Sequence, residues 1–200
     1  MRVGVLAMQG DFREHAQMLQ SLGAEVVEVR LPADLEGLDG LVIPGGESTA
    51  IARLLIRYEL LEPVRQVIRA GLPVMGTCAG MIVMAEHAEG LDREGLGVMA
   101  IDVKRNAFGR QADSFEADLV MPEVAPAPVH AVFIRAPLIE RVRPPAQALA
   151  TLDDGTVVAA RQDGMLALAF HPELTTDTRV HAYFLTLVKG RQRVSAAQRV

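Results

Sequence analysis

The chain has 200 residues, of which 50% are hydrophobic and 22% are charged, and it contains a single cysteine. One cysteine cannot form an internal disulfide framework, so a small secreted disulfide scaffold is excluded. The net charge is −5 and no basic stripe appears outside the C-terminal tail, which argues against nucleic-acid binding. The length suits one domain, expected at residues 1–190, with a frayed tail at residues 191–200.

Neither a membrane span nor a secretory signal is expected. The mean hydropathy is +0.22, but charged residues or prolines interrupt every apolar stretch before it reaches the ~20 residues that a span needs. Residues 1–6 contain one arginine and then a strand-like run, without the apolar core and cleavage site of a signal peptide. We therefore expect a cytoplasmic protein that does not bind membranes.

The first half of the chain alternates short apolar runs with amphipathic stretches of helical length, which is typical of βαβ units around a buried parallel sheet. Helices are expected between Phe12 and Gly23, after a cap at Ser48 or Thr49, from Pro63, and after Gly80. The expected strands cover residues 3–8, 25–30, 40–43 and 73–76.

Beyond Gly90 the pattern changes to strands with little helix between them, which predicts that antiparallel strands are added to the parallel ones. The chain closes with an expected helix at residues 179–193. The expected strands of this half cover residues 97–103, 114–120, 129–134, 148–152, 156–160 and 165–170.

The one cysteine lies in a motif typical of an enzyme nucleophile. Gly76-Thr77-Cys78-Ala79-Gly80 has the form G-x-nucleophile-x-G between an expected strand and an expected helix. The start of a helix favours a thiolate, and the N–H of Ala79 would face an oxyanion formed by attack. A lone cysteine is more often a buried structural residue. The flanking glycines and the strand–turn–helix context favour the nucleophile.

A thiolate needs a base and a group that orients the base, and His171 with Glu173 is the best pair. His171 ends an expected buried strand, and residues two apart in an extended chain point the same way, so the Glu173 carboxylate can accept a hydrogen bond from the imidazole. His87 lies ~13 Å along the expected helix from Cys78 and cannot reach it. No metal is expected, because no His/Cys cluster has ligand spacing. We expect surface or internally satisfied polar roles for His15, His130 and His181.

A glycine-rich loop and two arginines are further candidates. Pro44-Gly45-Gly46-Glu47-Ser48-Thr49 follows the third strand, and its glycines would let backbone N–H groups approach a ligand or an oxyanion. An ordinary strand–helix turn fits the loop equally well, and it lacks the phosphate-loop pattern. Arg105 and Arg135 could each hold a substrate carboxylate by two parallel hydrogen bonds, or could be solvated surface charges.

These three motifs, in this order, resemble those of the class I (triad) glutamine amidotransferases. Within that class the chain resembles the glutaminase subunit of pyridoxal 5′-phosphate synthase. The likeness covers about residues 3–188, nearly the whole chain. The segments that carry this closer resemblance are residues 5–10, 13–15, 105–106, 108–111, 113–118 and 133–137.

The resemblance implies an α/β three-layer sandwich with a mostly parallel central sheet and added antiparallel strands. It implies hydrolysis of L-glutamine to L-glutamate and ammonia without a cofactor. The ammonia passes to a synthase subunit that makes pyridoxal 5′-phosphate, with the glutaminase subunits arranged on a synthase ring core in a large hetero-oligomer. Such glutaminases are weak until docking on the synthase completes their oxyanion hole.

The same resemblance assigns roles to residues. Cys78 would be the nucleophile, His171 the base and Glu173 the group that orients the base. Gln9, next to the end of the first strand, is the candidate for the partner interface. The expected oxyanion positions are Gly45, Gly46 and Ala79. The expected glutamine-binding positions are Gly46, Glu47, Ser48, Arg105, Ile134 and Arg135.

Two alternatives stay open at this point. One is a class I glutaminase that feeds another synthase, such as the one for imidazole glycerol phosphate, although the middle motifs argue against it. The other is a protein without hydrolytic activity whose elbow cysteine serves as a redox sensor or stress-protective thiol. Such a protein would not need the His171-Pro172-Glu173 motif together with a Gly-Gly loop.

Overall fold

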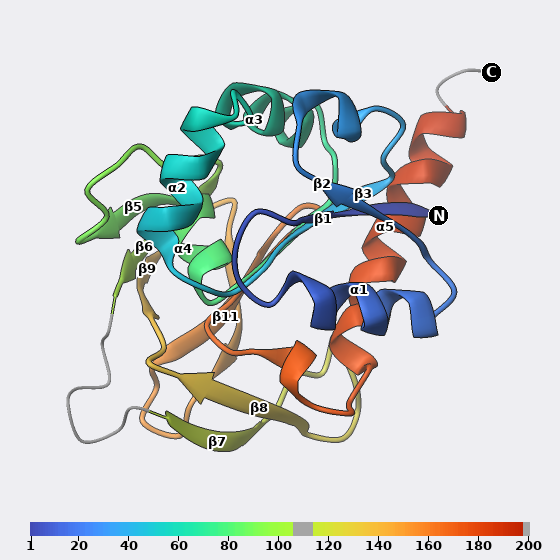
Figure 1. Cartoon of the computed structure of the whole chain (residues 1–200). Helices are drawn as coiled ribbons and strands as arrows, with labels where there is room; N and C mark the ends of the chain where they lie inside the picture. The colour runs from blue at the N-terminus through green and yellow to red at the C-terminus, as the bar shows by residue number, and fades with distance from the viewer. Residues whose placement is uncertain (106–113, 198–200) are drawn as a thin grey trace.

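The structure is a computed structural model that describes residues 1–105 and 114–197 (Figure 1). Residues 106–113 lie outside the described part. This gap contains or adjoins much of the sequence that carried the closer family resemblance, at residues 105–106, 108–111 and 113–118. Within the described ranges no helix is long and apolar enough to cross a membrane.

One mixed sheet forms the centre of the molecule. Its strands in chain order are β1 (Arg2–Leu6), β2 (Glu25–Val29), β3 (Gly40–Ile43), β4 (Val74–Thr77), β5 (Ala85–Glu89), β6 (Met99–Lys104), β9 (Leu138–Val142), β10 (Gln147–Thr151), β11 (Val157–Gln162) and β12 (Met165–Leu168). In space they follow the order β2-β1-β3-β4-β12-β11-β9-β6-β5, with β10 beside β11. The pairings from β2 to β12 are parallel, those from β12 to β6 are antiparallel, and β5 is parallel to β6.

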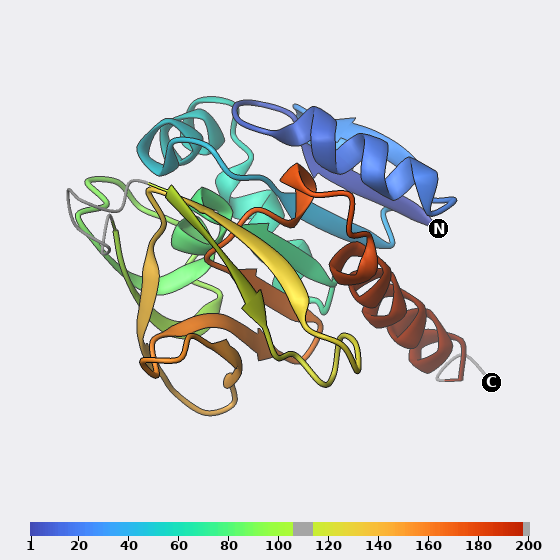
Figure 2. The same ribbon diagram turned by 90° about the horizontal axis from the view of Figure 1, so that it is seen from below.

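Helices cover both faces of the parallel strands, which gives the expected three layers. The helices are α1 (Phe12–Ser21), α2 (Ser48–Arg57), α3 (Leu61–Arg69), α4 (Ala79–Met84) and α5 (Arg179–Ala197), and the short 3-10 turns are η1 (Pro32–Leu35) and η2 (Pro172–Leu174). The helices α1 and α5 lie on one face, and α2 and α3 lie on the other (Figures 1 and 2). Strands β3 and β4 are buried along their whole length because both faces are covered.

A separate antiparallel pair, β7 (Ser114–Leu119) and β8 (Val129–Ile134), packs beneath the sheet (Figure 1). Phe115 and Phe133 stack with their ring centroids 4.4 Å apart, and Phe133 contacts Phe170, which follows β12, at 5.6 Å. The backbone N–H of His171 donates to the carbonyl of Val132 at 2.8 Å. The pair therefore fixes the segment that leaves β12.

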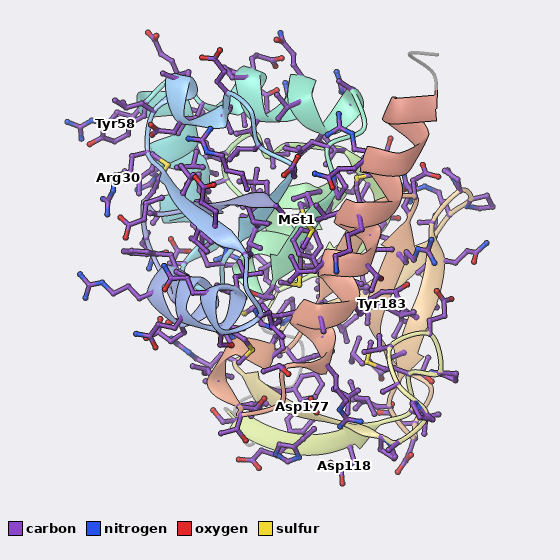
Figure 3. The ribbon with its side chains drawn as sticks, turned by 90° about the vertical axis from the view of Figure 1, so that its right-hand side faces the viewer. Met1, Arg30, Tyr58, Asp118, Asp177 and Tyr183 are labelled. Carbon is purple, nitrogen blue, oxygen red and sulfur yellow. The ribbon has the colours of Figure 1, made fainter. Side chains whose placement is uncertain are left out.

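The start of α5 is tied to the segment that joins β7 to β8. Asp177 lies just before the helix and Tyr183 lies on it (Figure 3). The Arg179 guanidinium binds the Asp177 carboxylate and donates to the carbonyls of Ala127 and Pro128. These contacts hold α5 against the β7–β8 pair.

Several boundaries differ from the sequence prediction. Strands β5 and β9 were not expected, because β5 is polar and mostly exposed and β9 has two charged residues in five. The predicted caps Ser48 and Thr49 are wrong: the N-cap of α2 is Glu47, whose carboxylate accepts from the N–H groups of Thr49 and Ala50. The last helix continues to Ala197, so residues 191–197 are helical where a frayed tail was expected.

The turn from β4 into α4 depends on a glycine at position 80. A methyl group there would lie 2.0 Å from the carbonyl oxygen of Ile43 on β3, closer than any real contact. The absence of a side chain at Gly80 therefore allows α4 to pack closely against β3.

We predict that Gly80→Ala lowers the free energy of unfolding by about 1–3 kcal/mol, because the added methyl group overpacks a backbone contact. The matched control is Gly190→Ala on the exposed side of α5, where a methyl group meets nothing within 4 Å. That change should raise the unfolding free energy by about 0.5–1 kcal/mol. Urea denaturation measures both, and equal values for the two variants would contradict the packing argument.

Candidate active site

Cys78 sits in a strained turn between β4 and α4. Its backbone has φ 47° and ψ −103°, a region that residues with side chains rarely adopt. Its N–H donates to the carbonyl of Leu168 on β12 at 2.7 Å, which anchors the turn from the neighbouring strand. Strain of this kind costs about 1–3 kcal/mol and concentrates at functional sites. The geometry is that of a nucleophile elbow.

His171 and Glu173 come together beside the elbow. Nδ1 of His171 lies 2.8 Å from Oε1 of Glu173. The contact does not arise from the extended chain that the sequence suggested: Glu173 belongs to the 3-10 turn η2, which folds the carboxylate back toward the imidazole. Gly45 makes room for the ring, since a methyl group at that position would lie 2.4 Å from Cε1 of His171.

The electrostatics of the site favour an ionised His171 and an ionised Glu173. Burial alone would lower the pKa of His171, but hydrogen bonds to Cys78 and Glu173 outweigh burial and raise the pKa to about 10. Burial alone would raise the pKa of Glu173, but His15 and His171 outweigh it and hold that pKa well below its usual range. The site therefore holds a positively charged imidazole against a negatively charged carboxylate.

His15 and His181 form a buried layer behind this group that sequence reasoning missed. Both side chains are wholly buried, and Nδ1 of His15 lies 2.9 Å from Nε2 of His181. Nε2 of His15 lies 3.1 Å from Oγ1 of Thr77 and 3.3 Å from Oε2 of Glu173. Both ring nitrogens of His15 have partners, as expected for an internally satisfied polar residue. The contact of His15 with the Glu173 carboxylate was not expected. His130 is half-buried and pairs with Glu116 and Asp118.

Asp11 is a second carboxylate that the sequence did not single out. Its Oδ2 lies 3.6 Å from Nδ1 of His171. Burial and then the charge of Glu173 raise the pKa of Asp11, while His171 opposes the rise. Asp11, His171 and Glu173 each offer a possible metal ligand within 4.8 Å of the others. The His171 nitrogen in this group is already bonded to Glu173, so the arrangement favours an ion pair over a metal site.

The elbow opens into a cavity of about 400 Å³ that gathers most of the expected site residues. Beyond those, the cavity is lined by Asp11, Ile82 and Leu174, none of which was expected. Arg135 lines it with a left-handed backbone of φ 42°. The expected residues that line it are Gln9, Gly46, Glu47, Ser48, Cys78, Arg105, Ile134, Arg135 and His171.

Within the cavity, several of these polar groups already bind one another. Arg105 Nη2 lies 3.1 Å from Oε1 of Glu47, and the Arg105 guanidinium also donates to the carbonyl of Gly90. Oε1 of Gln9 accepts from the N–H of Glu47 at 2.8 Å. The hydroxyl of Ser48 is buried and has no hydrogen-bond partner among the described residues. Ser48 is therefore a polar group available to a ligand.

Comparison with known proteins agrees with this geometry. The model of the SNO glutamine amidotransferase family matches residues 5–189. The chain belongs to this family. It is 58% identical to the pyridoxal 5′-phosphate synthase subunit PdxT of Moorella thermoacetica over 188 residues, covering 94% of this chain and 100% of that protein. It is 56% identical to PdxT of Herpetosiphon aurantiacus over 190 residues, covering 94% of this chain and 100% of that protein.

Solved structures place the fold in the same group of proteins. A crystal structure of a glutamine amidotransferase superposes with a TM-score of 0.89 at 48% identity and covers 94% of this chain and 98% of that one. The crystal structure of a putative GMP synthase component from Thermoplasma acidophilum superposes with a TM-score of 0.72 at 18% identity, with 98% of each chain covered. The second likeness shows the shared fold alone. The fold is that of the class I glutamine amidotransferases.

We predict that His171 stays protonated through neutral pH and that Cys78→Ala lowers its pKa from about 10 toward the ordinary 6.5, because the sulfur partner is lost. A raised folded-state pKa means that ionisation of His171 stabilises the fold fully below about pH 6.5 and that this contribution is lost as the pH rises toward 10. NMR of histidine-labelled protein measures the titration. His130 is the internal control, and a wild-type midpoint near 6.5 for His171 would contradict the ion pair.

Proposed function

We propose that this chain is the glutaminase subunit of a pyridoxal 5′-phosphate synthase, hydrolysing L-glutamine to L-glutamate and ammonia for a separate synthase subunit. The observation that carries the proposal is the strained Cys78 beside the His171–Glu173 pair, with Cys78 and His171 lining the cavity. The identity of more than half of the residues to PdxT proteins over nearly the whole chain supports the choice of synthase.

The first half of the reaction forms a thioester. The Cys78 thiolate attacks the side-chain carbonyl carbon of glutamine, a C–S bond forms, and the carbonyl electron pair moves to oxygen. The N–H of Ala79 and the backbone of Gly45 and Gly46 stabilise this oxyanion. The imidazolium of His171 donates its proton to the amide nitrogen, the C–N bond breaks, and ammonia leaves.

The second half releases glutamate. The neutral His171 takes a proton from water, and the resulting hydroxide attacks the thioester carbonyl. The C–S bond breaks, and the sulfur departs as the thiolate that began the cycle. Glu173 keeps the imidazole oriented and stabilises its positive charge in both halves, so one base serves both proton transfers.

Substrate binding relies on charge pairing within the cavity. Arg105 and Arg135 offer guanidinium groups for the α-carboxylate, and Glu47 offers a carboxylate for the α-ammonium group. The Ser48 hydroxyl and the Gly46 backbone supply further hydrogen bonds, and Ile134 lines the wall. These roles follow the expected glutamine-binding positions, which lie around one cavity.

The partner would dock at the mouth of this cavity. Leu174 is a large apolar residue there and is 42% exposed. Gln9 also lines the cavity and accepts a hydrogen bond from the N–H of Glu47, so contact of the partner with Gln9 would alter the loop that carries the expected oxyanion positions. A synthase ring core bearing several glutaminase subunits, and a cytoplasmic location, complete the proposal.

The test of this function is covalent labelling of Cys78. The protein is incubated with an affinity-labelling glutamine analogue, with and without the synthase subunit, and the adduct is located by mass spectrometry. We expect one adduct on Cys78 and glutamine-dependent formation of pyridoxal 5′-phosphate in the mixture. The absence of an adduct even with the synthase present would favour a redox or stress-protective thiol.

We predict that Cys78→Ala reduces ammonia release by roughly 1,000-fold or more while leaving folding and partner binding intact, because it removes the nucleophile with little loss of packing. Ammonia release, circular dichroism and pull-down with the synthase subunit measure the three properties. A misfolded variant would indicate that the cysteine is a structural residue.

We also predict that Glu173→Gln lowers kcat less than His171→Ala does, by a margin of roughly 10- to 100-fold, because Gln removes orientation and charge but keeps the base. Steady-state ammonia release in the presence of the synthase subunit measures both. Equal losses would count against these two roles.

A further inference from the structure

His15 is a wholly buried side chain that the reaction proposed above does not use. It projects from α1 into the space between β4, η2 and α5. A buried imidazole destabilises a fold unless its nitrogens are bonded, and here both are. Nδ1 lies 2.9 Å from Nε2 of His181, and Nε2 lies 3.1 Å from Oγ1 of Thr77.

The second contact of Nε2 is with Glu173. The atom lies 3.3 Å from Oε2 of that carboxylate, and both side chains are 0% exposed. The other oxygen, Oε1, is bound to His171 at 2.8 Å. Oε2 has no hydrogen bond among the described residues. Its ion-pair contact is the one with Nε2 of His15. The carboxylate therefore lies between two imidazoles.

The charge of Glu173 decides which nitrogen of His15 carries hydrogen. A bare lone pair on Nε2 would repel the carboxylate, so Nε2 carries a hydrogen, which Oγ1 of Thr77 accepts while Oε2 of Glu173 lies 3.3 Å from the same nitrogen. Burial, and then His15, lower the pKa of His181 to about 3, so His181 is neutral at its side of the pair. Nδ1 of His181 has no partner in the described part of the chain. His15 therefore directs its Nε2–H toward Thr77 and Glu173.

We propose that His15 is a positioning residue: its Nε2–H fixes the second carboxylate oxygen of Glu173 and so sets the direction in which Glu173 holds His171. A carboxylate held by one oxygen can rotate about its own axis, and fixing the other oxygen removes that freedom. Thr77, which precedes Cys78, accepts a hydrogen bond from the same nitrogen. His15 thus ties the group that orients the base to the strand that carries the nucleophile. The inference rests on the proposed glutaminase function.

Two conservative variants separate this role from mere packing. In His15→Gln the side-chain amide nitrogen reaches the position of Nε2, so the donor to Glu173 is retained. In His15→Asn the amide reaches only the position of Nδ1, so the contact with His181 is retained and the one with Glu173 is lost. His87→Asn, on exposed β5, is the control for substituting a histidine elsewhere.

We expect His15→Asn to lower kcat for ammonia release by about 10- to 100-fold with KM for glutamine unchanged, because misplacement of a catalytic group by ~1 Å has effects of that size. His15→Gln should stay within about threefold of the wild type, a small change because the donor is kept. Combined with Glu173→Gln, the Asn variant should add little further loss. An unchanged kcat in folded His15→Asn, or equal losses in both variants, would overturn the proposal.

A readout that needs no turnover separates this inference from the proposed function. The Nδ1–H proton of His171, bonded to Glu173, gives an NMR signal that should persist in wild type and His15→Gln and be lost in His15→Asn. If the wild type shows no glutaminase activity with the synthase, the function fails while this signal still tests the positioning. If His15→Asn does not fold, loss of the signal in folded His15→Gln overturns the proposal.

Discussion

The left-handed backbone of Cys78 is the constraint on which the site depends. A residue with a side chain adopts φ 47° only where the surrounding structure fixes both of its sides. The carbonyl of Leu168 on β12 fixes one side, and the close approach of Gly80 to Ile43 on β3 fixes the other. The turn therefore requires β3, β4 and β12 to lie side by side. The parallel half of the sheet meets this requirement, and the separate β7–β8 pair holds His171 through the carbonyl of Val132.

A buried carboxylate is the second constraint. An ionised Glu173 away from water would destabilise the fold by several kcal/mol unless other groups compensated its charge. His171 supplies that compensation from one side and His15 from the other. Because His15 comes from α1 and Glu173 from η2, the charge also joins the first and last parts of the chain, which lie side by side (Figure 2). The same electrostatics therefore link α1 to the carboxylate that binds His171.

The parts of the site that the sequence predicts are those that short contiguous segments encode. Cys78 and its glycines, and His171 with Glu173, were recognisable because each motif is contiguous and chemically specific. His15 lay within a segment already noted for its resemblance, yet its partner is 158 positions away, so no local pattern could reveal the contact. Strands β5 and β9 were missed because edge position and partial exposure remove the apolar signal. The 3-10 turn at Glu173 was missed because periodicity does not distinguish a single turn from an extended exit.

Glu47 links the cavity to the framework of the protein. Its carboxylate accepts from two N–H groups at the start of α2 and also binds Arg105, while Gln9 holds its backbone. A free amino acid is a zwitterion, and in the proposed function it would meet here an anion and a cation that lie 3.1 Å apart. The guanidinium has five donors, so it can bind a ligand carboxylate without releasing Glu47. Under the proposed function this pair would be formed before the substrate binds, which reduces the reorganisation that binding requires. Because the residue that caps α2 also lines the cavity, the geometry of the cavity wall is fixed by the fold itself.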